Sequence, residues 1–112
     1  MRKADDATRL GHIFDAICCI ETYAGGVDRS AFLGNKMMQD AIMRQIEIIG
    51  EASGHISEEL QEKHPEVPWF EMRAIRNKIV HDYMEINTDI IWDTIQNDLP
   101  ALKPVIEKLL GE

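Results

Sequence analysis

The segment from residue 69 to residue 83 holds the side chains whose types and spacing are suited to chemistry. His81 titrates near neutral pH and can accept or donate a proton. Arg76 carries a permanent positive charge, which can stabilise negative charge that develops on a phosphate group. Residues 69–81 contain three basic side chains and one acidic one, a local charge of +2, whereas the whole chain carries -8. We therefore expect an anion to bind at this segment.

A continuous helix from Pro68 to about Tyr83 would place Arg76 in the middle of an apolar face. The apolar residues of that face are Trp69, Met72, Ile79, Val80 and Tyr83. Burying a guanidinium without a partner costs several kcal/mol, because the group keeps its charge. Arg76 must therefore be paired, or this face must open onto a cleft or a subunit interface.

The same helix would not by itself bring Arg76 and His81 together. Five residues advance an ideal α-helix by about 500°, so the two side chains would point roughly 140° apart. They can meet at one ligand if the helix loosens near His81, if the arginine reaches around the helix, or if a two-fold partner supplies a second pair. Asn77 and His81, four residues apart, share one side of the helix. We favour a site at a dimer interface; the alternative is that all three are ordinary surface or salt-bridge residues.

Charged residues also form a stripe along a second predicted helix, over about residues 35–53. The stripe consists of Asp40, Arg44, Glu47 and Glu51. Such a stripe is typical of a solvated helix face whose ion pairs support the helix. In the functional alternative, Glu47 or Glu51 faces Arg76 and holds it in place. Gly50 costs about 1 kcal/mol relative to alanine inside this helix, which indicates the close approach of another helix.

Apolar residues recur every three or four positions along most of the chain, as they do in amphipathic helices. We expect long helices over about residues 10–24, 35–53, 68–83 and 88–109. A turn covers about residues 28–33, and a short helix follows Ser57. No segment shows sustained alternation with a period of two, which strands would require. The sequence therefore predicts an all-α fold, an antiparallel bundle of four or five helices, with residues 1–112 as a single domain.

Individual residues mark the ends of these helices. The pair Gly25-Gly26 stops the first helix, since glycine accepts the left-handed conformation that ends many helices. Asn87 or Thr88 caps the last helix. Pro100 and Pro104 must kink or restart that helix, because each lacks a backbone N–H donor.

The composition of the chain argues against several classes of function. With a net charge of -8 the chain should not bind nucleic acid through its overall field, so a nucleic-acid site needs a local basic patch. The apolar runs are too short to span a membrane, and we find no secretion signal. The adjacent Cys18 and Cys19 suit neither a disulfide framework nor a zinc site, and His12, His55 and His64 lack partners at metal-ligand spacing. We expect a cytoplasmic protein with no metal site, no cofactor and no membrane contact.

Residues 76–83, Arg-Asn-Lys-Ile-Val-His-Asp-Tyr, resemble the R-x4-H-x-Y motif of the HepT-like toxins, which belong to the HEPN superfamily of helical domains. Other segments are similar to landmarks of the same family, in the same order and at similar spacing. These are Gln39-Asp40-Ala41, Arg44, residues 47–52, residues 65–69 and residues 97–100. The resemblance covers most of the chain, from about Leu10 to Leu110.

The resemblance implies a metal-independent ribonuclease that acts as the toxin of a type VII toxin–antitoxin pair. It also implies a homodimer, in which two copies of the motif line a shared cleft. Arg76 and His81 take the catalytic positions, and Asn77 matches the polar residue that often follows the arginine. Tyr83 matches the tyrosine that the antitoxin, a minimal nucleotidyltransferase (MNT), can modify with AMP. The alternative, from a different class, is a non-catalytic helical module that binds a nucleotide or docks the nucleotidyltransferase.

Overall fold

The computed structural model describes residues 4–80 and 85–112 of the chain. Helices form its regular structure, and the β contact within these residues is an isolated antiparallel bridge between Val80 and Ile86. The predicted all-α fold is confirmed. No helix in the described part of the chain is both long enough and apolar enough to cross a membrane.

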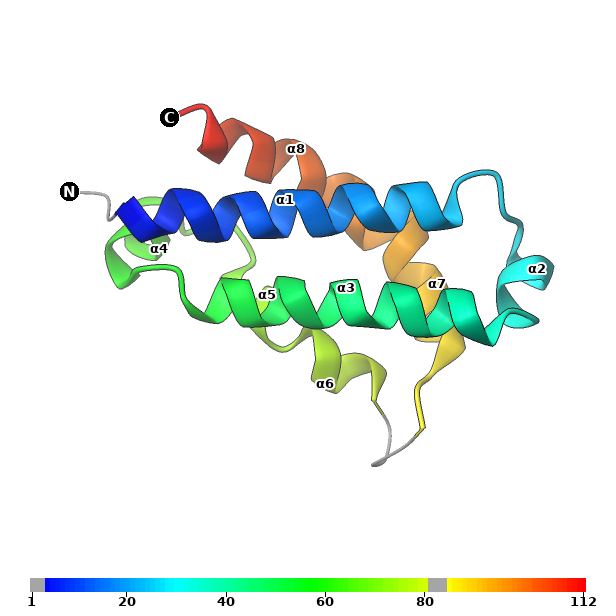
Figure 1. Ribbon diagram of the computed structural model, residues 1–112. Coiled ribbons are helices and arrows are strands. Elements are labelled where there is room, and N and C mark those ends of the chain that lie inside the picture. The colour runs from blue at the N-terminus through cyan, green and yellow to red at the C-terminus, as the bar shows by residue number, and fades with distance from the viewer. Residues whose placement is uncertain (1–3, 81–84) are drawn as a thin grey trace.

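Two long helices, α1 (Ala4–Ala24) and α3 (Lys36–Gly54), lie side by side and run in opposite directions (Figure 1). A third helix, α8 (Leu99–Leu110), also packs against α1. Isoleucine side chains fill the core between these helices, and their burial supplies the main favourable contribution to folding. The fully buried isoleucines on α1, α3 and α8 are Ile13, Ile17, Ile20, Ile42, Ile46, Ile49 and Ile106.

Capping side chains begin the three helices that directly follow α1. Asp28 caps α2 (Arg29–Leu33), Asn35 caps α3, and Ser57 caps α4 (Glu58–Lys63). Each of these side chains accepts a hydrogen bond from the backbone N–H three residues later, which satisfies one of the free donors of the first turn. The first of these segments, expected as a turn, is therefore a short helix, and the short helix predicted after Ser57 is confirmed.

A break at Ala74 divides the helix that the sequence predicts over residues 68–83. The two parts are α5 (Trp69–Arg73) and α6 (Ile75–Ile79). Between them, Ala74 has φ -91° and ψ 5°, outside the α-helical region. Both parts pack against α3, and this tertiary contact overrides the local preference for one continuous helix. The prediction of an unbroken helix is therefore wrong.

The helix also ends earlier than predicted, at Ile79. Val80 is extended, with φ -82° and ψ 115°, and forms the bridge to Ile86. The backbone N–H of Asn87 donates to the carbonyl of Ile79 at 2.8 Å. The chain therefore leaves helical geometry before it reaches His81, which lies outside the described residues.

The last predicted helix has three parts. The first, α7 (Thr88–Asp93), begins at its cap Asn87, one of the two predicted alternatives. A π-helical turn, η1 (Thr94–Asp98), joins α7 to α8. Pro100 is the second residue of α8 and follows the π-helical turn with no break in the helical backbone, since Asp98 and Leu99 both have αR geometry, so the predicted restart is not seen there. Pro104 lies inside α8 without ending it.

A buried carboxylate fastens the start of α1 to the start of α4. Asp6 is only 1% exposed. Its two oxygens accept hydrogen bonds from Ser57, one from the backbone N–H at 2.9 Å and one from the hydroxyl at 2.6 Å. Because Ser57 also caps α4, this contact joins two segments that are far apart in the sequence at one end of the molecule (Figure 1).

We predict that Asp6→Ala lowers the free energy of unfolding by about 1–3 kcal/mol, because the half-buried donors of Ser57 lose their acceptor. Urea unfolding followed by circular dichroism measures the loss. Asp5→Ala is the matched control, since Asp5 is exposed and its ion pair among residues 4–80 and 85–112 is with Arg9 on the same helix. That variant is expected to lose less than about 0.5 kcal/mol. Equal losses in the two variants would contradict the role given to Asp6.

Candidate functional site

Arg76, at the start of α6, reaches toward α3 and not into the core. Its Nε donates to Oε2 of Glu47 at 3.3 Å, and its side chain is 52% exposed. The buried residues of α6 are Ile75 and Ile79. The expectation that Arg76 lies in the middle of an apolar face is therefore wrong, because Ile75 and Ile79 form the buried face of α6. Of the two carboxylates considered as its partner, Glu47 makes the contact.

Arg76 and Glu47 belong to a hollow of about 370 Å³ between α3 and the α5–α6 segment, which we call the arginine hollow. Its lining residues are Arg44, Glu47, Gly50 and Glu51 from α3, and Arg73, Arg76 and Asn77 from α5 and α6. Three positive and two negative side chains give this hollow a charge of +1, within a chain of net charge -8. Its sign and size suit a phosphate group.

Gly50 allows the α5–α6 segment to approach α3 at the floor of the hollow. A Cβ atom at this position would lie 3.4 Å from the carbonyl oxygen of Arg73 and 3.5 Å from Cγ2 of Ile75. The close helix approach predicted from this glycine is confirmed. The approach is what places Arg76 within reach of Glu47, three residues earlier on α3.

The three arginines of the hollow are held differently. Arg76 pairs with Glu47, and Nη1 of Arg73 donates to Oε1 of Gln61 at 3.0 Å. Arg44 makes no ion pair or side-chain hydrogen bond with any residue in 4–80 or 85–112. The sequence interpretation treated Arg44 as part of a solvated stripe and missed its place in the hollow. The signal was its spacing, since Arg44 lies three residues before Glu47 and therefore on the same face of α3.

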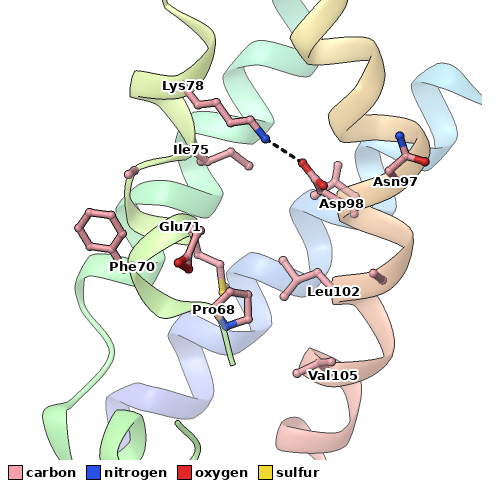
Figure 2. Close-up of a pocket in the computed structure, with 13 residues that line it drawn as sticks. Pro68, Phe70, Glu71, Ile75, Lys78, Asn97, Asp98, Leu102 and Val105 are labelled. Carbon is pink, nitrogen blue, oxygen red and sulfur yellow. Dashed lines mark hydrogen bonds and ion pairs between the residues drawn. The ribbon is translucent and has the colours of Figure 1, made fainter. Parts of the chain in front are cut away.

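Lys78, the third basic residue of the predicted anion-binding segment, lies on a different surface. Its Nζ pairs with Oδ2 of Asp98 at 3.3 Å across one end of a second hollow, the apolar groove (Figure 2). This groove has a volume of about 540 Å³ and separates α5 and α6 from η1 and α8. Its apolar lining includes Pro68, Phe70, Met72, Ile75, Leu102 and Val105. The basic segment is thus divided between two surfaces, and Asp98 compensates the charge of Lys78.

The remaining predicted site residues are only partly covered by the structure. Asn77 and Glu51 line the arginine hollow. His81 and Tyr83 lie outside the described residues, so a meeting of His81 with Arg76 stays a prediction. Because α6 ends at Ile79, the separation of roughly 140° expected on a continuous helix no longer applies. Within the described ranges, no three His, Cys, Asp or Glu side chains gather as metal ligands would.

Comparison with known proteins identifies the family. Residues 13–109 match the family model described as ribonuclease HepT-like. The chain belongs to the HepT-like ribonuclease family. The resemblance seen in residues 76–83 is thereby confirmed at the level of the family, and the HepT-like region includes every element that lines the arginine hollow.

Curated relatives extend over nearly the whole HepT-like chain. A "Probable ribonuclease HepT" of Thermococcus cleftensis is 40% identical over 100 residues, which are 89% of this chain and 91% of that protein. A "Putative RNase" of Methanocaldococcus jannaschii is 36% identical over 107 residues, which are 96% of this chain and 98% of that protein. No solved structure matches the chain significantly.

We predict that Gly50→Val lowers the free energy of unfolding by about 1–3 kcal/mol, because the added methyl groups press on the backbone of the α5–α6 segment. The measurement is thermal or urea unfolding. Gly11→Val on α1 serves as the control, since a Cβ there meets nothing within 4 Å, and a change within about 0.5 kcal/mol is expected. If the two variants lost stability equally, close packing at Gly50 would not be the cause.

Proposed function

We propose that this chain is a metal-independent endoribonuclease whose reaction takes place at Arg76 and His81. The observation that carries the proposal is the position of Arg76, whose guanidinium is paired with Glu47 at a positively charged hollow five residues before His81. Membership of the HepT-like family supports RNA as the substrate.

The proposed reaction uses the 2′-hydroxyl of RNA as the nucleophile. His81 takes the proton of this hydroxyl while its oxygen bonds to the neighbouring phosphorus, and the bond from phosphorus to the 5′ oxygen breaks. The products are a 2′,3′-cyclic phosphate and a 5′-hydroxyl. Negative charge grows on the phosphate oxygens in the transition state, where Arg76 stabilises it. DNA lacks the 2′-hydroxyl and is not cleaved.

Neighbouring groups support these two residues in the proposal. Glu47 orients the guanidinium of Arg76, and Asn77 adds a neutral amide to the lining of the hollow. Glu51, the second carboxylate considered, lines the same hollow farther along α3. The leaving 5′ oxygen needs a proton, and in a homodimer a second copy of His81 supplies it. The homodimer is therefore part of the proposed mechanism.

The resemblance of residues 76–83 further supports a place in a toxin–antitoxin pair. We propose that the chain is the toxin of a type VII pair that acts on RNA in the cytoplasm. Its antitoxin is a minimal nucleotidyltransferase that transfers AMP to the hydroxyl of Tyr83. The added phosphodiester is a bulky anion seven residues after Arg76, so it would obstruct the RNA site and compete for the positive charge of the hollow.

A non-catalytic role is the second candidate, in which the module binds a nucleotide or docks the nucleotidyltransferase. The net charge of -8 favours it, because the overall field of an acidic chain repels a long RNA. A single nucleotide, unlike a long RNA, needs to contact only the hollow in order to bind. The two candidates differ in whether the purified chain cleaves RNA.

We predict that the purified wild-type chain cleaves total RNA in the presence of EDTA, and that Arg76→Ala and His81→Ala each lower the rate at least about 100-fold. Gel electrophoresis of the RNA measures the cleavage. Lys78→Ala is the matched control, because it removes a nearby positive charge on the other surface and is expected to retain activity. RNA left intact by the wild-type chain would favour the non-catalytic module.

We predict that Tyr83→Phe remains toxic and escapes enzymatic silencing by the antitoxin, because it lacks the hydroxyl that accepts AMP. Growth after induction, with and without an active nucleotidyltransferase, measures both properties. A catalytically inactive nucleotidyltransferase is the control for silencing by binding alone. If the active nucleotidyltransferase silences the variant as efficiently as it silences the wild type, Tyr83 is not the modified residue.

A further inference from the structure

Arg44 is a positive side chain of the arginine hollow that has no counter-ion in the described part of the chain. Arg76 is paired with Glu47, and Arg73 is hydrogen-bonded to Gln61. Arg44 is exposed, so its charge is not needed to satisfy a buried group. The hollow thus offers one guanidinium whose five N–H donors are available to a ligand.

The register of the helices places Arg44 at one particular end of the hollow. The α5–α6 segment runs along α3 in the opposite direction, since Gly50 lies against Arg73 and Ile75, whereas Glu47 lies against Arg76. Moving back along α3 therefore corresponds to moving forward along α6. Arg44 lies at the end of the hollow toward which α6 ends.

The two ends of the hollow differ in charge. Glu51 is seven residues from Arg44, a distance of about 10.5 Å along α3. The end with Glu51 also holds Arg73, so its charges cancel. The other end holds Arg44 together with the Arg76–Glu47 pair and carries the net positive charge. An anion that reaches the hollow is therefore drawn to Arg44 and Arg76.

We infer that Arg44 binds a backbone phosphate of the RNA next to the phosphate that is cleaved. This inference rests on the proposed ribonuclease function and names a further substrate-binding residue for it. Arg76 faces the scissile phosphate, and Arg44, one helical turn from Glu47 on α3, holds its neighbour by charge-assisted hydrogen bonds. The site then recognises a chain of phosphates, and a substrate with a single phosphate gains nothing from Arg44.

The test measures the binding of a 2′-O-methyl RNA hexamer, which lacks the nucleophile and cannot be cleaved by the proposed reaction. Arg44→Ala is expected to weaken binding about tenfold. It is also expected to reduce the slope of the log of the association constant against the log of the salt concentration by about 0.7, which corresponds to the loss of one phosphate contact with a single strand. Arg44→Lys, which keeps the charge, is expected to bind within about threefold of the wild type. Lys36→Ala is the matched control, because Lys36 lies on α3 outside the hollow and pairs with Asp40.

Kinetics provide the second readout. On an unmodified RNA hexamer, Arg44→Ala is expected to raise KM about tenfold while kcat stays within about threefold, and on a dinucleotide with one phosphate neither value changes. The inference is overturned if Arg44→Ala binds the modified hexamer as tightly as the wild type and Lys36→Ala do. The wild-type chain could bind the modified hexamer through Arg44 and yet leave the unmodified hexamer intact. That result would support the phosphate site and exclude the ribonuclease function.

Discussion

The site depends on the close contact between the middle of α3 and the junction of α5 and α6. Gly50 lies at this contact, where a Cβ atom would touch the backbone carbonyl of Arg73 at 3.4 Å and a larger side chain would press on it. The contact leaves room beside it for long charged side chains from both segments. It also fixes the register in which Arg76 meets Glu47. A packing constraint thus determines which charges of the two helices become neighbours.

The charge distribution of the molecule follows from that arrangement. The basic side chains of one short sequence segment are separated, so Lys78 is compensated by Asp98 at the apolar groove and Arg73 and Arg76 remain at the arginine hollow. α3 adds Arg44 to the hollow. The hollow carries a charge of +1 while the chain as a whole carries -8, which restricts where a polyanion can approach. Such a charge distribution favours selective contact with a few phosphates over broad electrostatic binding.

Features that depend on local sequence could be predicted, and features that depend on tertiary contacts could not. The caps of α4 and α7 are local, since a side chain accepts a hydrogen bond from a nearby N–H, and the sequence predicted a helix after Ser57 and a cap at Asn87 or Thr88. The break at Ala74 has no local signal, because the contact with α3 imposes it. The partner of Arg76 was narrowed to two carboxylates, but choosing between them required the register of two helices. Arg44 was missed for the same reason, since its surroundings come from another segment.

The π-helical turn η1 marks a place where the chain can lose a residue. A π-helical turn contains about one residue more than an α-helical turn, and the helices on either side of it keep their own faces toward the core. Loss of one exposed residue from this turn, such as Gln96 or Asn97, would convert it to an ordinary turn without rotating α7 against α8. Deletion of a single residue is therefore better tolerated at this turn than within α3, where it would shift half of the arginine hollow out of register.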